Sequence, residues 1–498
     1  MRNLIVCCDG SWATIDSRQN GILCPTNVAR IYHAADCGSE TKYYHSGVGT
    51  EGGWWAKFRG GIVGEGLDKN IMSAYEWLVG NYQNGDKIFI FGFSRGAYTA
   101  RSLAGMIDTC GLLESSDIQD DVEERWKRVE TIFKEGYRER KPPKQYPVRS
   151  IRIHFLGVWD TVGALGVPDN YAVLSAFFNK ASKYSFHNTV LSNNIDHARH
   201  AVALDEKRAS FTPTLWTLPV PSGCDVKQVW FPGGHGDVGG GCLEKGLSDG
   251  ALKWMMKEAA DCGLQFKPDI IDQQVKPDPQ DISHDALSGI FKMLRTQPRS
   301  CPPILLGGGF LLNDIHQSAL DRQQNPPIVL GDYRPTKILG IGDIQEIVVY
   351  VREHWAETGI YLEKGGTYDF AAKGQWVLGG KTKCAPDNNK YFSLQCLSGS
   401  MFGGVENIFK RVFHNEKCDF LSTKRVEEIP LFDLTGVVAN AHNPDPDGTP
   451  PSPEIFKIGR EQRGYQAKES GYLYCFVNDA WGFYGTHQGS LTLTVKRI

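Results

Sequence analysis

The order of apolar and polar residues divides the chain into an N-terminal part, where strand and helix patterns alternate, and a C-terminal part with strand patterns alone. Between the short strand-like runs, amphipathic patterns predict helices, of which the longest repeats apolar residues at three- and four-residue steps from Leu67 to Tyr82. Strands that alternate with helices favour a mostly parallel sheet covered on both faces. The predicted strands of the N-terminal part are residues 4–8, 42–45, 87–91, 151–158 and 226–231.

From about Leu339 the helix patterns end, and short alternating strands separated by Gly, Asn and Asp turns follow. We therefore expect an α/β domain over residues 1–338 and an all-β sandwich over residues 339–498. Insertions into the first domain are expected at residues 113–147, 168–187 and 265–303. The second of these carries Phe177 and Phe178 with little charge, and is either a lid over a cleft or an ordinary connecting segment.

The composition limits which binding partners and which cellular compartment we expect for the protein. The formal net charge of -3 and the lack of a basic stripe exclude a nucleic-acid-binding role. The 13 cysteines show no framework spacing and no Cys-x-x-Cys pair, which fits reduced thiols and no structural zinc. The first apolar run ends at Asp9 and no run is long enough to cross a membrane, so we expect a protein made in the cytoplasm without a signal peptide, exported only by a signal-independent route. No cofactor is expected.

A Gly-x-Ser-x-Gly sequence centred on Ser94 directly follows the strand pattern of residues 87–91. A strand that turns sharply into a helix exposes its turn residue at the edge of the sheet, where a serine can act as a nucleophile. The backbone N–H of Arg95 would then donate to an oxyanion beside the helix N-terminus. A second Gly-x-Ser-x-Gly sequence, at Ser248, has no strand before it, so Ser248 is predicted to cap a helix.

The partners that a serine nucleophile needs follow two other predicted strands. Asp160 comes after residues 151–158, and His235 comes after residues 226–231. The carboxyl ends of parallel strands meet at one edge of a sheet, and the order serine, acid, histidine is that of α/β-hydrolases. We therefore predict Ser94 as the nucleophile, His235 as its base and Asp160 as the residue that orients the base.

Other residues compete for these roles. His154 lies within a strand pattern, and Asp237 belongs to the glycine-rich turn after His235, although it stays a possible acid. His197 and His200 are expected on a helix, in packing roles.

The turn Asp9-Gly10-Ser11 ends the first predicted strand. Its glycine allows close approach to the nucleophile, so a backbone N–H of Gly10 or Ser11 is a candidate for the second oxyanion donor. Asp9 could instead bind a cation or only hold the turn.

The chain carries five motifs in this order: Asp9-Gly10-Ser11-Trp12, Gly92-Phe93-Ser94-Arg95-Gly96-Ala97, Gly157-Val158-Trp159-Asp160-Thr161-Val162-Gly163, Ala198-Arg199-His200-Ala201-Val202-Ala203-Leu204-Asp205-Glu206 and His235-Gly236-Asp237-Val238-Gly239-Gly240-Gly241. Together they resemble a family of uncharacterised α/β-hydrolases that includes the catalytic domains of type VI secretion phospholipase effectors. The resemblance covers roughly residues 1–330. It implies a serine esterase of the phospholipase A type that acts on lipid esters at a membrane surface, with Ser94, Asp160 and His235 as the triad. It also implies secretion-apparatus and immunity proteins as partners. A soluble carboxylesterase or peptidase of the same fold, or a carbohydrate-binding protein with an inactive hydrolase domain, are the alternatives.

The C-terminal part resembles the PA-I-type galactose-binding lectins, at residues 355–376 and 476–491. In that family an Asn-Asp run and a later pair of asparagines hold a calcium ion that binds sugar hydroxyls. Asp479 matches this pattern and is the possible metal ligand, but Thr486 and His487 replace the two amide ligands. Because calcium requires several oxygen ligands, we expect no tight metal site, and a carbohydrate or docking partner for the domain instead.

Overall fold

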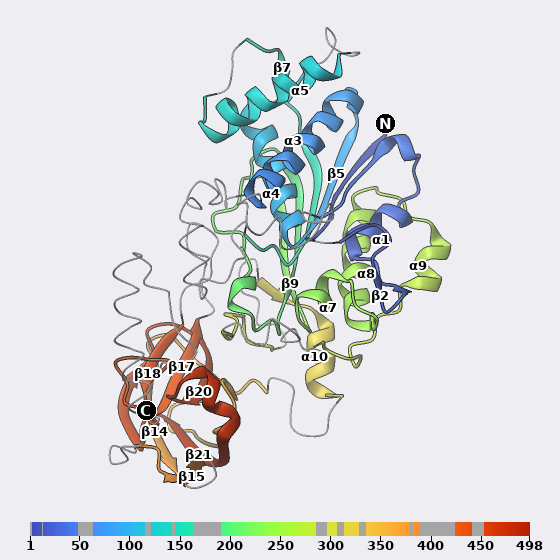
Figure 1. Cartoon of the computed structure of the whole chain (residues 1–498). Coiled ribbons are helices and arrows are strands. Elements are labelled where there is room, and N and C mark those ends of the chain that lie inside the picture. Colours follow the sequence, from blue (N-terminus) through green and yellow to red (C-terminus); the bar gives the residue numbers. More distant parts are fainter. Residues whose placement is uncertain are drawn as a thin grey trace.

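The computed structural model describes residues 2–11, 13–47, 63–114, 121–141, 145–163, 191–284, 296–305, 313–327, 335–378, 382–387, 424–440 and 453–498. These residues form an α/β part and an all-β part that adjoin each other (Figure 1).

Within the described residues, seven parallel strands form one sheet in the order β11-β10-β9-β8-β5-β1-β4. Most of these strands are nearly continuous runs of buried residues, as a parallel sheet covered on both faces requires. The predicted fold class is therefore confirmed. The strands are β1 Asn3–Cys8, β4 Lys42–His45, β5 Lys87–Phe93, β8 Ile153–Trp159, β9 Ile195–Ala203, β10 Asp225–Phe231 and β11 Asn313–Ile315, and the two-residue strands β2 Arg18–Gln19, β3 Ile22–Leu23, β6 Leu112–Leu113 and β7 Val148–Arg149 lie outside the sheet.

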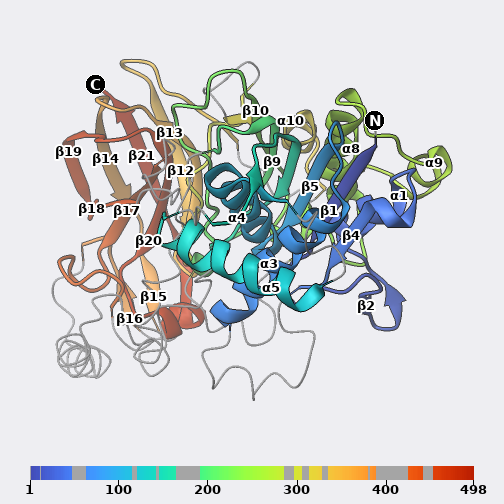
Figure 2. The ribbon, with the colours of Figure 1, turned by 90° about the horizontal axis from the view of Figure 1, so that it is seen from above.

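Helices cover the two faces of the sheet and create two separate cores (Figure 2). Successive side chains of a strand point to opposite faces, so Leu4 and Val6 of β1 pack with α3, α4 and α5, whereas Ile5 and Cys7 pack with α1 and α8. The helices are α1 Asn27–Ala34, α3 Val63–Asn81, α4 Arg95–Cys110, α5 Val122–Thr131, α7 His235–Gly239, α8 Gly246–Asp261, α9 Pro268–Gln274 and α10 Gln317–Gln324, with the shorter turns η1 Ser39–Thr41, η2 Ile132–Arg138, η4 Ala209–Phe211 and η6 Trp481–Thr486.

Two local predictions are wrong. His197 and His200 lie on strand β9, not on a helix, because their side chains have partners on the neighbouring strand: Asp225 at 3.2 Å and Gln228 at 2.9 Å. Ser248 lies inside the first turn of α8 rather than at its cap, and its hydroxyl donates to the carbonyl of Lys245 at 3.1 Å.

The all-β part consists of two antiparallel sheets that face each other across a third core. One has the order β16-β15-β21-β14-β19, with β12 also paired to β21, and the other has the order β13-β20-β17-β18. This agrees with the sandwich expected for the C-terminal residues, and we propose the boundary between residues 338 and 339. The strands are β12 Ile344–Tyr350, β13 Ala356–Leu362, β14 Thr367–Lys373, β15 Trp376–Leu378, β16 Thr382–Cys384, β17 Leu434–Asn440, β18 Glu454–Lys457, β19 Glu461–Gln466, β20 Gly471–Val477 and β21 His487–Arg497.

The described residues cover the predicted insertions only in part. The first insertion contains α5 and η2, and the third contains α9 and the segment 296–305. The second insertion, with Phe177 and Phe178, lies outside the described residues. In the part of the chain that is described, no helix is both long and apolar enough to cross a membrane.

Candidate active site

Ser94 occupies the sharp turn between β5 and α4. Its backbone angles, φ 57° and ψ -125°, lie in a region that residues other than glycine seldom adopt. The two flanking glycines are sterically required: a Cβ at Gly96 would lie 2.1 Å from the carbonyl oxygen of Cys8, and one at Gly92 would lie 2.6 Å from the carbonyl oxygen of Gly96. Close packing around the turn thus holds Ser94 in a strained position at the edge of the sheet.

Ser94 lies between the carboxyl ends of β1 and β8. Its N–H donates to the carbonyl of Trp159 at 3.1 Å, and its carbonyl accepts from the N–H of Val162 at 3.4 Å. On the other side, a Cβ at Gly10 would lie 3.4 Å from the Cβ of Ser94. The predicted nucleophile is therefore adjacent to the turn that carries Asp160.

Asp160 and His235 form a buried pair. Nδ1 of His235 lies 2.6 Å from Oδ2 of Asp160, and the two side chains are 8% and 0% exposed. The other carboxylate oxygen accepts from the N–H of Ala203 at 3.0 Å. Because the carboxylate accepts a hydrogen bond from Nδ1–H, Nε2 is the ring nitrogen left to act as a base. The structure brings the predicted acid and base together.

Aromatic rings fix the imidazole beside the serine turn. The ring of Phe93 lies 4.6 Å from that of His235, and the ring of Phe211 meets it edge-on at 4.9 Å. Phe93 directly precedes Ser94, so this contact places the His235 ring beside the end of the strand that leads into the serine turn. Gly239 makes room for the arrangement, because a Cβ there would lie 1.9 Å from the Phe93 ring.

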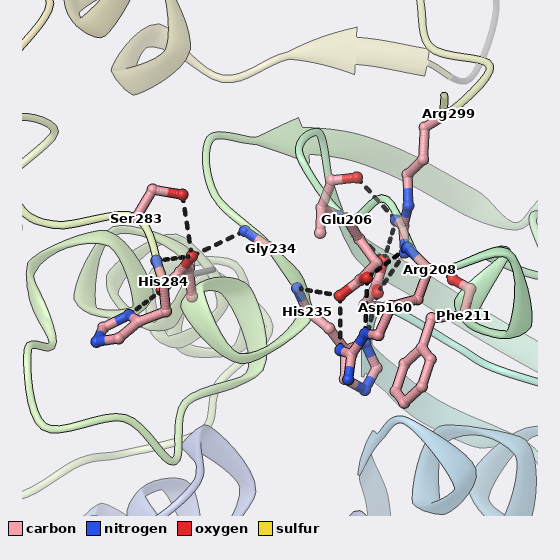
Figure 3. A network of polar contacts seen from close by, with 11 residues as sticks. Asp160, Glu206, Arg208, Phe211, Gly234, His235, Ser283, His284 and Arg299 are labelled. Carbon is pink, nitrogen blue, oxygen red and sulfur yellow. Dashed lines mark hydrogen bonds and ion pairs between the residues drawn. The ribbon is translucent and has the colours of Figure 1, made fainter. Parts of the chain in front are cut away.

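Arg299 is the third residue of this buried cluster. It was not predicted from the sequence, because no motif surrounds it. Its guanidinium binds Asp160 through both carboxylate oxygens, at 2.7 and 3.0 Å, and donates to the carbonyls of Ala203 and Phe211, each at 2.7 Å (Figure 3). Burial opposes ionisation of Asp160, but Arg299 and His235 outweigh this effect and hold the pKa of the carboxyl well below its ordinary value. Asp160 therefore stays ionised although it is fully buried.

Glu206 is a second residue that sequence reasoning missed, although it ends one of the resemblance motifs. Its carboxylate accepts from the backbone N–H of His235 at 3.3 Å and pairs with Arg208 at 2.7 Å (Figure 3). Burial raises the pKa of Glu206, yet Arg208 and Arg299 lower it more. The Arg208 guanidinium also lies 3.6 Å above the ring of Phe211. This network holds the backbone of the histidine as Asp160 holds its ring.

Asp237 belongs to a different pair. Its carboxylate receives Nδ1 of His284 at 2.6 Å, the N–H of Gly234 at 2.8 Å and the N–H of His284 at 3.1 Å. In Figure 3, His284 lies apart from Asp160 and His235. Asp237 therefore shapes the glycine turn and is not the partner of His235.

One group of three side chains in the described residues is of the metal-ligand type. Ligand atoms of Asp237, Cys242 and His284 lie within 4.8 Å of one another, but the two ring nitrogens of His284 already face carboxylates, Asp237 at 2.6 Å and Glu244 at 2.9 Å.

In the all-β part, the Asp479 carboxylate contacts Nε2 of His487 at 2.9 Å and accepts from the N–H of Ala480 at 2.7 Å. His487 thus occupies a carboxylate oxygen of Asp479, the acidic residue that matches the lectin pattern. That the domain binds no calcium tightly stays a prediction.

The first turn is held by Asp9. Its carboxylate accepts from the hydroxyls of Thr26 and Tyr44, each at 2.6 Å, and from the N–H of Gly10 at 2.7 Å. Burial raises the pKa of Asp9 to about 6 against the effect of these bonds. The N–H of Gly10 therefore points to Asp9 in this state, which leaves the N–H groups of Arg95 and Ser11 as the better candidates for oxyanion donors.

A strained serine turn and a buried histidine–aspartate pair at the carboxyl edge of a parallel sheet define a protein of the α/β-hydrolase-like class. Residues 2–258 match the family model described as the type VI secretion system phospholipase effector Tle1-like catalytic domain. The chain belongs to this family, as its sequence motifs indicate.

Several individual proteins are similar to the chain. The uncharacterized protein YEL023C of Saccharomyces cerevisiae is 30% identical over 250 residues, which is 44% of this chain and 33% of the yeast protein. The match therefore spans about a third of that relative's length. A solved structure of an uncharacterized protein from Pseudomonas aeruginosa is 20% identical, with a TM-score of 0.37 over 56% of this chain and 49% of that one.

Two further solved structures are similar to part of the chain. The Tle1 effector bound to the VgrG spike of the type VI secretion system is 18% identical, with a TM-score of 0.27, over 49% of this chain and 52% of that one. The N-terminal domain of EclA, a PllA-like lectin, is 14% identical, with a TM-score of 0.20, over 31% of this chain and 95% of the lectin.

Proposed function

We propose that this protein is a serine hydrolase that cleaves lipid esters, most specifically a phospholipase of the A type. The observation that carries the proposal is the 2.6 Å pair of His235 and Asp160 packed against the strained turn of Ser94. Membership of the phospholipase effector family supports a lipid as the substrate. The effector role, with a secretion apparatus and an immunity protein as partners, belongs to the same proposal.

The reaction follows from the proposed roles. Nε2 of His235 accepts the hydroxyl proton as Oγ of Ser94 attacks the ester carbonyl, and the backbone N–H of Arg95, with that of Ser11, stabilises the oxyanion. The intermediate collapses, and the imidazolium returns the proton to the departing alcohol, a lysophospholipid. Water then attacks the acyl-enzyme with His235 again as base, which releases the fatty acid and restores Ser94.

Asp160 supports both steps without exchanging a proton. It fixes the tautomer of His235 and stabilises the imidazolium that forms in each transition state. Because its pKa is well below the ordinary range, it remains a carboxylate at every pH at which the histidine can serve as a base. The proposal therefore expects one ionisation to control the acidic side of the activity profile.

The test uses the full chain and its Ser94→Ala variant on phospholipid vesicles and on a soluble short-chain ester. A fluorophosphonate probe should label the wild type and not the variant, and only the wild type should release fatty acid from vesicles. Phospholipids with different acyl chains at the two positions then identify the bond that is cleaved.

Absence of labelling would reject the serine mechanism, and would favour a carbohydrate-binding protein with an inactive hydrolase domain. Labelling with activity confined to the soluble ester would reject the lipid substrate and favour a carboxylesterase.

A further inference from the structure

The segment 296–305 lies between the α/β part and the all-β part, and it carries Arg299. Both ends of the segment are bonded to the all-β part, and the first end also pairs with the α/β part, where the N–H of Gln297 donates to the carbonyl of Lys207 at 2.7 Å. Nε1 of Trp355 donates to the hydroxyl of Thr296 at 2.9 Å, and the N–H of Ile304 donates to the phenol oxygen of Tyr472 at 2.8 Å. Arg299 thus lies between two anchor points that belong to the other part of the molecule.

An apolar cluster also joins the segment 296–305 to both parts of the molecule. Cys301 and Ile304 are fully buried, and they pack in one cluster with aromatic side chains of strands β13 and β20. Val202 and Leu204 of the α/β part belong to the same cluster. They flank Ala203, whose N–H bonds to Asp160 and whose carbonyl bonds to Arg299. The interface between the two parts therefore lies directly behind the acid of the proposed triad.

We propose that the all-β part is a structural component of the active site, because it holds Arg299 against Asp160 and so sets how strongly the imidazolium of His235 is stabilised. Arg299 is a positioning residue that acts through Asp160. This inference rests on the proposed function for its catalytic meaning, but its structural content can be measured without turnover.

Other titratable and charged groups also lie near His235 and Asp160. Besides Asp160 and Arg299, the charged side chains near His235 in the described part of the chain include Glu206 and Arg208, which pair with each other at 2.7 Å and offset each other's charge. His200 approaches from β9, and burial lowers its pKa to about 3, so it adds no charge near neutral pH. Arg299 is then the positive charge whose removal leaves the Asp160 carboxylate to act on His235 alone.

Three variants separate the charge of Arg299 from its placement. Arg299→Gln removes the charge, Arg299→Lys keeps the charge but not the planar fork, and the double variant Thr296→Val/Tyr472→Phe removes both anchor bonds while leaving the arginine. Arg30→Gln is the matched control, because Arg30 also forms a buried pair, with Asp249 at 2.5 Å, and donates none of its hydrogen bonds to Asp160 or His235.

The readout is the pH titration of the His235 ring, followed by NMR of histidine-labelled protein and assigned by the signal lost in His235→Gln. Arg299→Gln should raise the midpoint by about one pH unit, since a nearby positive charge that opposes protonation is lost. The acidic limb of kcat/KM on a soluble ester should move upward by the same amount. Arg299→Lys should move the midpoint less and lower kcat, and Arg30→Gln should leave both unchanged.

The anchor variant decides the role of the all-β part. Thr296→Val/Tyr472→Phe should raise the midpoint in the same direction, and should add nothing in the Arg299→Gln background, because both changes act through one residue. An unchanged midpoint, or a shift that adds fully to that of Arg299→Gln, would overturn the inference. If the midpoints of the His235 titration shift as expected but the protein shows no turnover, the result would support the coupling between the all-β part and His235 and would reject only the proposed function.

Discussion

Asp160→Asn tests the assignment of the acid, and Asp237→Asn provides an unusually close control. Each aspartate is buried and receives Nδ1 of a histidine at 2.6 Å, together with at least one backbone N–H. The two substitutions therefore remove the same charge from similar surroundings, and only one of them acts on the proposed base.

The expected losses differ in kind. Asp160→Asn leaves the guanidinium of Arg299, which is 4% exposed, without its carboxylate, so the free energy of unfolding should fall by about 3–5 kcal/mol. Turnover should fall by roughly 10³- to 10⁴-fold, because the imidazolium of His235 loses its stabilising charge and the ring loses its fixed tautomer. Asp237→Asn should cost about 1–3 kcal/mol of stability and less than roughly tenfold in turnover.

The measurement is kcat on a soluble ester, below the melting temperature of each variant, with folding checked by circular dichroism and stability measured by urea unfolding. A soluble ester is used because interfacial binding would otherwise mix with the chemical step. If Asp237→Asn lost more turnover than Asp160→Asn while remaining folded, the acid would be misassigned and the reasoning from the 2.6 Å contact would fail.

Four more results are expected. Ser94→Ala and His235→Ala should each lower turnover by several orders of magnitude, with the double variant scarcely worse, and independent multiplicative losses would argue against one catalytic unit. Gly96→Ala should fail to fold stably, since its Cβ would lie 2.1 Å from a backbone carbonyl, whereas Gly80→Ala in helix α3 meets nothing within 4 Å and should add up to about 1 kcal/mol of stability, both measured by thermal melting. Because the pKa of Asp160 is lower in the folded protein than the ordinary value of about 3.9, the ionised carboxylate stabilises the fold above that pH, and this stabilisation is lost as the pH falls below it. Asp160→Asn lacks this stabilisation, so its acid unfolding should begin at a higher pH than that of the wild type. Calorimetry of the full chain with calcium and galactose should show no micromolar, sugar-dependent site, and such a site would reverse the reasoning on the lectin-like part.

Much of the fold could be predicted because its strands are short apolar runs and its long helices have clear periodicity. Strand β9 could not. It carries Arg199, whose guanidinium is buried and pairs with Glu258 at 2.5 Å and with Asp225 across the strand pair. A local pattern of charged and histidine residues suggests exposure, and only partners distant in the sequence make such a strand compatible with the interior.

The sequence predicted Ser94 as the nucleophile because its motif is local, but it did not predict the supporting residues Arg299 and Glu206. The glycines around Ser94 are required by backbone contacts within one turn, so they leave a motif. Arg299 and Glu206 act through contacts with residues 139 and 29 positions away, and such contacts impose no spacing on the sequence. Their roles appear only when the chain is folded.

The sequence left open whether Asp160 or Asp237 pairs with His235, and the structure pairs His235 with Asp160 and Asp237 with His284. Nδ1 of His284 binds Asp237, and its Nε2 faces the carboxylate of Glu244 at 2.9 Å, so neither ring nitrogen is available to take a proton from a nucleophile. His235 instead packs on Phe93, one residue before Ser94, with its Nδ1 side held by Asp160. A carboxylate on one nitrogen prepares an imidazole to act as a base, whereas carboxylates on both nitrogens fix it as a structural cross-link. For this reason we propose the pair at His235, and not the one at His284, as the one that activates a serine.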